Sequence, residues 1–383
     1  MKDNVRGKTT MIEIPKLARR SLVMSVLLVA FAWGSWSALA DSAKATRYLQ
    51  TNLVSDQPDV ALLQDTNLVN AWGMSFGPTT PFWISDNGTG LATLYAVTND
   101  AMGTVHVVKQ GLKVTIPGEG NPTGQLFDGT GAFNGDIFIF VSEDGTVSGW
   151  RPALGTAAET LTARDSAIYK GVTRVDTTAG PMLLAANFSE GTIDAYDASF
   201  NLTQFSDPHA PAGYAPFNVQ LVAGAVFVTF AKQDADKEDD VAGPGHGLID
   251  IFNPETGVFR RFATGSDAGG HLRAINSPWG ITLAPKSFGK HGDQLLVGNF
   301  GSGTIMVFEA DGKFRGQLLG LHRGPVVIEG LWALGFGNGG RGGNPDTLYF
   351  TAGPDDESHG LFGSLQPVPK KHDKHDGDDD EDD

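Results

Sequence analysis

The sequence contains no cysteine, which excludes disulfide bonds, thiolate nucleophiles, cysteine-based zinc sites and a lipid anchor on cysteine. Helix-forming patterns are scarce, and the most apolar stretch, residues 22–33, is too short to span a bilayer comfortably. Basic residues are outnumbered by acidic ones, 28 to 44, and the formal net charge is −16. Such a charge disfavours nucleic acids and anionic membrane surfaces as partners.

Glycine, in contrast, is abundant, at 50 of 383 residues, and 40% of the residues are hydrophobic. Glycine tolerates positive φ angles, so it is typical of tight turns between short strands. The composition therefore predicts an all-β protein with a sizeable core.

The first forty residues differ from the rest of the chain. Basic residues precede the apolar stretch, and the small residues Ala38 and Ala40 then match the pattern of a signal peptidase site. We expect residues 1–40 to be a signal peptide and the mature protein to be secreted, to the periplasm or outside the cell. A retained anchor is the weaker alternative, and Arg19-Arg20 also permits twin-arginine export. Because the leader carries a net +4, cleavage leaves −20.

The other end of the chain, residues 368–383, is a low-complexity His/Asp tract that becomes strongly acidic after Gly377. We expect this tail to be disordered and solubilising. Loose chelation of divalent ions is the alternative.

Between these ends the chain repeats a pattern of an apolar strand, a turn with Asn or Asp, a Gly, and a second strand that ends in an aromatic residue. The copies begin near residues 82, 137, 183, 226, 295 and 348. Each is preceded by another strand with a turn signal, and these markers lie at 72, 123, 170, 217, 279 and 332. Their spacing matches four-stranded blades of about 40–50 residues, apart from one acidic insertion at 232–245 that indicates a surface loop.

The prediction is a six-bladed β-propeller over residues 41–367, with a seven-bladed ring or a β-solenoid as the alternative. The sixth unit runs out of chain after its third strand, at 361–365. Residues 48–54 are strand-like and belong to no earlier blade. We expect this N-terminal strand to complete the sixth blade and close the ring, which would cover two exposed strand edges.

The segments YLQTNLVS (48–55), NLVNAWGMSF (67–76), PFWISDNGTGLATLY (81–95) and NFGSGT (299–304) resemble an uncharacterised family of exported bacterial proteins often found with PEP-CTERM sorting tails. The resemblance covers most of residues 47–366 and implies a secreted propeller without an established activity. The sorting tail itself is missing from this sequence. More distantly, the strand openings and hairpins are similar to those of NHL-type and gluconolactonase-like propellers.

In such a blade, the loops that enter the first strand and the hairpins between the second and third strands lie on the same face. That face surrounds the central channel, where propellers usually bind ligands. The expected ligand-binding residues on it are Asn70, Asn121, Lys170, Asn218, His271 and His322. The two histidines lie in long loops, where either could act as a general base or anion clamp, or simply be solvated.

Carboxylates and amides around one axis suit a hard cation such as Ca²⁺. By analogy with gluconolactonase-like propellers, Asp86, Asn187, Asn299 and Glu329 would surround a divalent ion that activates water or polarises a carbonyl. The alternative is that these residues only begin turns, by bonding to their own backbone. Similarly, Trp72, Trp279 and Trp332 form either an aromatic shelf for a ligand or, more simply, packing between blades.

Two functions follow from these patterns. The first is a monomeric, non-enzymatic module that binds a small molecule, a polysaccharide or a protein on the top face of the channel. The second is a divalent-metal-dependent hydrolase or lyase of the gluconolactonase-like type. The sequence has no arrangement typical of a Ser-His-Asp triad, and whether the protein is an enzyme is left open at this point.

Overall fold

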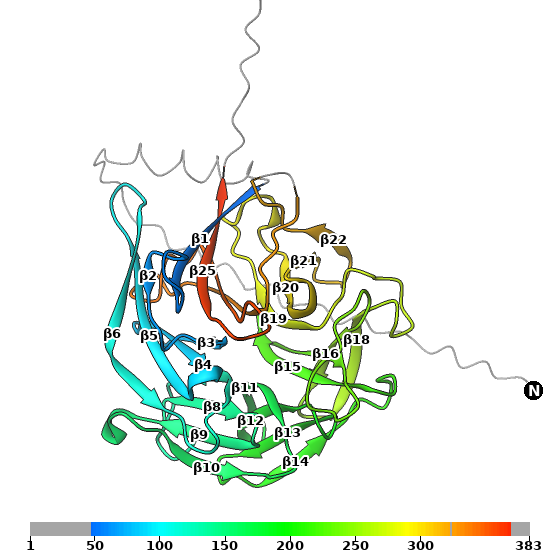
Figure 1. The fold of residues 1–383 in the computed structure, drawn as a ribbon. Coiled ribbons are helices and arrows are strands. Elements are labelled where there is room, and N and C mark those ends of the chain that lie inside the picture. The colour runs from blue at the N-terminus through cyan, green and yellow to red at the C-terminus, as the bar shows by residue number, and fades with distance from the viewer. Residues whose placement is uncertain (1–46, 322–323, 369–383) are drawn as a thin grey trace, which may run out of the picture.

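The computed structural model describes residues 47–321 and 324–368, which form six β-sheets around a common centre (Figure 1). Five sheets have four strands and the sixth has five. The predicted six-bladed β-propeller is therefore confirmed. The predicted signal peptide (1–40) and the tail beyond residue 368 lie outside the described residues. Among the residues described, no helix has both the length and the apolar character needed to span a membrane.

The blades follow one another in chain order, and each begins at the centre of the ring. Blade 1 comprises β3 (Ala71–Ser75), β4 (Phe82–Asp86), β5 (Leu91–Asn99) and β6 (Val105–Thr115). Blade 2 comprises β7 (Pro122–Phe127), β8 (Phe138–Ser142), β9 (Thr146–Trp150) and β10 (Glu159–Ala163). Blade 3 comprises β11 (Tyr169–Thr177), β12 (Gly180–Asn187), β13 (Thr192–Asp197) and β14 (Leu202–Phe205).

The second half of the ring repeats this arrangement. Blade 4 comprises β15 (Tyr214–Val222), β16 (Ala225–Lys232), β17 (Leu248–Asn253) and β18 (Val258–Thr264). Blade 5 comprises β19 (Pro278–Leu283), β20 (Leu295–Asn299), β21 (Ile305–Phe308) and β22 (Phe314–Gln317). Blade 6 comprises β23 (Leu331–Phe336), β24 (Leu348–Ala352), β25 (Leu361–Val368), β1 (Arg47–Ser55) and β2 (Leu63–Gln64). Four single-turn 3₁₀ helices lie in the loops: η1 (Asn87–Thr89), η2 (Pro152–Leu154), η3 (Gly289–His291) and η4 (Phe300–Ser302).

Each inner strand has an irregularity shortly after its start, where its register with the second strand of the blade shifts. Glycines at this point let neighbouring inner strands approach closely. A Cβ atom on Gly73 would lie 2.3 Å from the Thr123 carbonyl oxygen, and one on Gly280 would lie 2.4 Å from that of Trp332. The backbones of these neighbouring inner strands therefore lie close together at the level of the glycines.

At the position just before this point, the inner strands of blades 1, 4, 5 and 6 carry an aromatic residue. We call the rings of these four residues the plug: Trp72, Phe217, Trp279 and Trp332. All four are nearly fully buried and belong to one apolar cluster. The rings of Trp72 and Trp332 stack with centroids 3.6 Å apart, and Phe217 of blade 4 lies 5.8 Å from Trp332 of blade 6. Trp72 and Trp332 belong to the neighbouring blades 1 and 6, but the contact between Phe217 and Trp332 joins blades 4 and 6, which are not neighbours. The plug therefore crosses the channel, which agrees with packing between blades rather than an open aromatic shelf.

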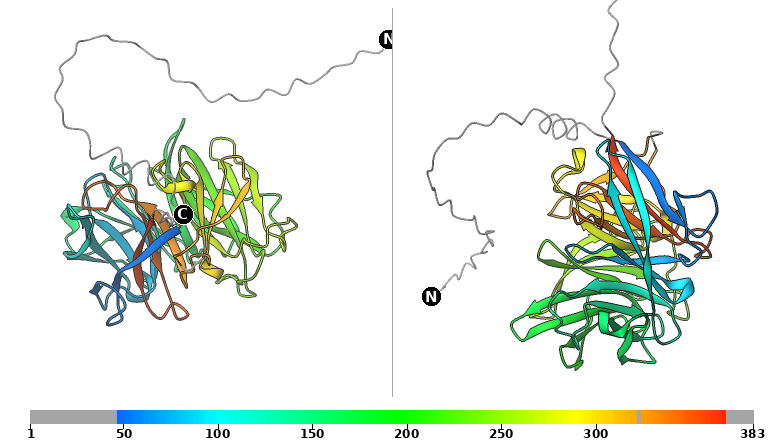
Figure 2. Two further views of the ribbon diagram at one scale, coloured as in Figure 1. Left: turned by 90° about the horizontal axis from the view of Figure 1, so that it is seen from above. Right: turned by 90° about the vertical axis from the view of Figure 1, so that its left-hand side faces the viewer.

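The ring is closed as the sequence predicted. β1 pairs antiparallel with β25 along its whole length, from Arg47 opposite Val368 to Ser55 opposite Leu361. Figures 1 and 2 show these two strands, blue and red, side by side. The short strand β2 adds a fifth, parallel strand outside β1. The first described residues therefore supply the fourth strand of the last blade.

Tyr48 of β1 also connects blade 6 to blade 5. Its side chain is 1% exposed, its hydroxyl donates to the Phe288 carbonyl oxygen at 3.1 Å, and its ring stacks on that of Phe288 at 4.7 Å. The closing strand is thus held by side-chain packing as well as by its backbone pairing.

We predict that Tyr48→Ala lowers the free energy of unfolding by about 3–5 kcal/mol, because it removes a buried aromatic ring and leaves a cavity at the closure. Leu49→Ala is the matched control, since Leu49 is the next residue of β1 and is 40% exposed. Urea unfolding followed by circular dichroism measures both changes. An equal loss in the two variants would contradict the role of Tyr48 in closing the ring.

Candidate functional site

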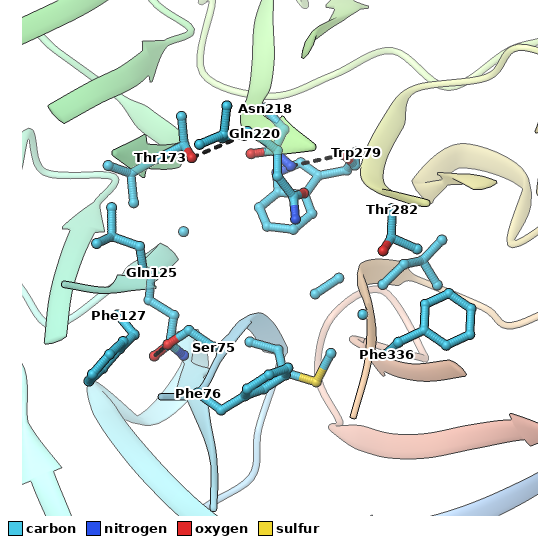
Figure 3. A pocket seen from close by; sticks show the side chains of 18 of the residues that line it. Ser75, Phe76, Gln125, Phe127, Thr173, Asn218, Gln220, Trp279, Thr282 and Phe336 are labelled. Atoms are coloured by element: carbon cyan, nitrogen blue, oxygen red, sulfur yellow. Dashed lines mark hydrogen bonds between the residues drawn. The ribbon is translucent and has the colours of Figure 1, made fainter. Parts of the chain in front are cut away.

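The plug divides the channel into two parts with different chemistry. Above it, at the starts of the inner strands, lies a cavity of about 360 Å³ that we call the top mouth. Below it lies a second cavity of about 470 Å³, the lower cavity, lined by the later residues of all six inner strands (Figure 3). Pairs such as Ala71 with Asp86 and Tyr169 with Asn187 place the strand 2–3 hairpins around the top mouth, as the sequence predicted.

Lys170 is the central cation of the top mouth. It is the second residue of β11, at the position that aromatic residues occupy in the plug, and it is only 1% exposed. Its ammonium group forms ion pairs with Glu143 at 2.5 Å and Asp239 at 3.2 Å, and lies 5.3 Å from the ring centroid of Trp72. Burial lowers the pKa of Lys170, but the charges of Glu143 and Asp239 outweigh it and leave the pKa above its ordinary value. Lys170 is therefore a stable cation.

Asn70 links this ion-pair cluster to the plug. Its Nδ2 group donates to Glu357 and to Asn87 Oδ1, while its Oδ1 atom accepts from Trp332 Nε1 at 3.0 Å. Asn87 in turn donates to Glu143 at 2.9 Å. Burial raises the pKa of Glu357 to about 7. The carboxyl group of Glu357 therefore titrates near neutral pH beside a fixed amide.

The insertion between β16 and β17 contributes two further carboxyl groups, Asp239 and Asp240, to the top mouth. Burial raises the pKa of Asp240 to about 6, and the charge of Lys170 lowers it only in part. The insertion is a surface loop, as predicted, but neither aspartate was predicted as a site residue. The signals available in the sequence were the acidic composition of the insertion and the long interval between markers 217 and 279.

The four residues predicted to hold a metal ion do not share contacts in the structure. Asp86 is fully buried at the end of β4, and burial raises its pKa well above the usual range. Asn187 bonds to Glu190, Asp194 and the turn of its own blade, and Asn299 does the same with Ala274, Asn276 and Thr304. Glu329 alone lines the top mouth. Asn187 and Asn299 therefore bond within or beside the turns of their own blades, which agrees with the alternative that these residues only begin turns.

The other predicted ligand-binding residues are divided between the two ends of the channel. Asn70 and Lys170 lie at the top mouth, and Asn121 lies nearby, where its carbonyl oxygen accepts from the Glu143 amide at 3.1 Å. Asn218, which we expected close to the entry ring, instead lines the lower cavity, because it follows Phe217 of the plug. His271 is exposed in the loop between β18 and β19. His322 lies outside the described residues.

Within residues 47–321 and 324–368, no three His, Asp or Glu side chains are arranged so that they could hold a metal ion. The top mouth nevertheless gathers more carboxyl groups than the sequence suggested. Its lining includes Asp239, Asp240, Glu329, Asp356 and Glu357 around Lys170. The calcium hypothesis stays a prediction. Of the two carboxylates first proposed for it, Glu329 lines this cavity and Asp86 does not.

No family model matches the sequence. The uncharacterized protein R648 of Acanthamoeba polyphaga mimivirus is 29% identical over 342 residues, covering 82% of this chain and 78% of that protein. Among solved structures, an auxiliary nutrient binding protein from Bacteroides ovatus is similar with a TM-score of 0.50 and 13% identity, over 84% of this chain and 77% of the other. Virginiamycin B lyase from Staphylococcus aureus has a TM-score of 0.49 and 11% identity, over 84% and 100%.

The solved structures bear on the fold, and the viral relative bears on the family resemblance described in the sequence analysis. The structure from Bacteroides ovatus shares the fold alone, at an identity well under 25%. The sequence relative is a viral protein, so the resemblance to exported bacterial proteins with PEP-CTERM tails gains no support. What the chain binds has to be argued from its own side chains.

We predict that Glu357→Gln makes stability less dependent on pH. Because the pKa of Glu357 is raised in the folded state, the folded protein holds a proton that the unfolded chain loses, and stability falls as pH rises from about 4.5 to about 7. Glutamine removes this loss, which we expect to be about 1–2 kcal/mol after allowance for the partial exposure of Glu357.

Urea unfolding at pH 5 and pH 8 measures this difference. Glu329→Gln is the matched control, since Glu329 is an exposed carboxylate of the same cavity. The prediction fails if the wild type and Glu357→Gln lose the same stability between the two pH values.

Proposed function

We propose that this protein is a ligand-binding β-propeller whose top mouth binds a small, positively charged organic molecule. The observation that carries the proposal is the lining of this cavity, which includes five carboxyl groups and one lysine. Two of the five, Glu329 and Asp356, are exposed and form no ion pair with any described residue. Their charges are available to a ligand.

The floor of the cavity supports the same ligand class. Its aromatic residues include Trp72, Phe300 and Trp332, and the rings of Phe300 and Trp332 stack at 4.0 Å. The protein's own ammonium group, on Lys170, lies over Trp72 and Phe188 at 5.3 and 5.9 Å. Cations are attracted to the faces of such rings, most strongly where water is displaced. The negative charge of the whole chain also favours the approach of cations.

The leader-like first forty residues support export, and we propose that binding takes place outside the cytoplasm, by a monomer. A polysaccharide or a protein would also meet the exposed carboxylates of the rim. However, the cavity of about 360 Å³ is suited to a small molecule.

Acid–base catalysis is a second candidate function, and the carboxyl groups of Glu357 and Asp240 favour it. With pKa values of about 7 and 6, either group can accept or release a proton near neutral pH, and Lys170 would stabilise negative charge in a reacting molecule. A hydrolase or lyase reaction would use these groups rather than Asp86, Asn187 or Asn299. A divalent ion would have to be held by the carboxylates of the rim.

We predict that 1,4-diaminobutane raises the melting temperature by about 2–5 °C at a hundredfold excess over its Kd, and that neither glucose nor CaCl₂ does so at the same concentration. The double variant Glu329→Gln/Asp356→Asn should bind the diamine at least tenfold more weakly, because it removes both unpaired carboxylates. Calorimetric titration measures the affinity.

The control variant is Asp59→Asn, which removes one exposed charge from the loop between β1 and β2. An unchanged affinity in the double variant would contradict the proposal. A stoichiometric response to Ca²⁺ without a response to the diamine would favour the metal-dependent alternative.

A further inference from the structure

The lower cavity is a second candidate binding site, and it is separate from the top mouth. It is built by all six inner strands below the plug, from β3, β7, β11, β15, β19 and β23, and has a volume of about 470 Å³. Trp279 forms part of its upper boundary, and its indole Nε1 group donates to the Lys170 carbonyl oxygen at 3.0 Å. The buried plug therefore lies between the two cavities, and a molecule in one does not contact the other.

The lining of the lower cavity is uncharged, unlike that of the top mouth. Its polar members are amides and hydroxyls, and the remaining side chains are apolar. Figure 3 shows Phe76, Phe127 and Phe336 on one side of the space and the amides of Asn218 and Gln220 on the opposite side. The amides of Asn218 and Gln220 thus lie across the space from the phenylalanine rings, while Gln125 and Ser75 lie beside those rings.

Two buried amides make the lining of the lower cavity rigid. Gln125 is 7% exposed, donates to the carbonyl oxygens of Gly73 at 2.8 Å and Trp83 at 3.1 Å, and accepts from the Ser75 hydroxyl. Asn218 is 3% exposed and donates to the Trp279 carbonyl oxygen at 2.9 Å. These bonds join neighbouring blades, so the shape of the cavity is built into the ring.

Two other polar side chains in the lining are not used in this way. Gln220 and Thr282 are half-buried, and neither side chain makes a hydrogen bond within the part of the chain that the structure describes. They offer an amide and a hydroxyl to a bound molecule. A charged ligand would lose its hydration here without an opposite charge in the lining, which costs several kcal/mol.

We propose that the lower cavity binds an uncharged small molecule that combines an aromatic or other apolar ring with a hydroxyl-bearing part. The ring lies against Phe76, Phe127 and Phe336, and the hydroxyl groups bond to Gln220 and Thr282. Binding is independent of the charged top mouth and of the ligand proposed for it.

Two matched probes test the proposal by calorimetric titration of the whole protein: phenyl β-D-glucoside, which is neutral, and phenyl β-D-glucuronide, which has the same rings and one carboxylate. We expect the glucoside to bind with one-to-one stoichiometry and the glucuronide at least tenfold more weakly. Gln220→Leu, which keeps the size of the side chain, should weaken binding of the glucoside five- to tenfold by removing hydrogen bonds.

A second variant, Thr282→Leu, replaces the hydroxyl with a larger apolar group and should have a similar effect, and melting curves establish that both variants fold. Glu329→Gln, at the top mouth, should leave the affinity for the glucoside unchanged. The proposal is overturned if the glucoside does not bind at millimolar concentration, if the glucuronide binds equally well, or if Glu329→Gln abolishes binding while Gln220→Leu preserves it.

Discussion

The contacts that cross the central channel are the constraint on which the rest of this structure depends. Trp72 and Trp332 stack, Phe217 reaches Trp332 from blade 4, and Trp279 of blade 5 donates to the backbone of Lys170 in blade 3. The first contact joins the neighbouring blades 6 and 1, and the other two join blades that are not neighbours. They hold the six inner strands around a filled centre and separate the channel into two cavities of opposite character.

The ion-pair cluster at the top mouth lies directly against this plug, through the contacts of Lys170 with Trp72 and of Asn70 with Trp332. A buried ammonium group without partners would lose several kcal/mol of hydration, and Lys170 recovers it from Glu143, Asp239 and the aromatic faces below it. Burial raises the pKa values of the neighbouring groups Glu357 and Asp240, and repulsion by the charge of Asp239, joined by that of Glu143 in the case of Glu357, adds to the increase. The pKa values of the groups at the top mouth therefore depend both on their burial and on the charges of their neighbours.

The fold could be predicted because its signals are local and repeated. Strand–turn–strand patterns recur at blade spacing, and residues 48–54 stand apart from them, so both the blade number and the closing strand followed from the sequence. The site was harder to predict, because its residues come from irregular loops. Asp239, Asp240 and Glu357 occupy no repeated position, and nothing in their spacing indicates that they meet at Lys170. Asn218 shows a different difficulty. It directly follows Phe217 of the plug, and this difference of one residue places its side chain in the lower cavity instead of the top mouth.

The pairing of β1 with β25 also has a consequence for how the molecule is assembled. β1 leaves the ribosome about 300 residues before its partner strand exists, an interval of about 15–60 s at ordinary rates of synthesis. Until then β1 has no β25 to pair with, and an unpaired strand edge readily pairs with other chains. The first strand that the structure describes is thus among the last to pair, and the yield of folded protein depends on keeping it free of other partners until β25 has been made.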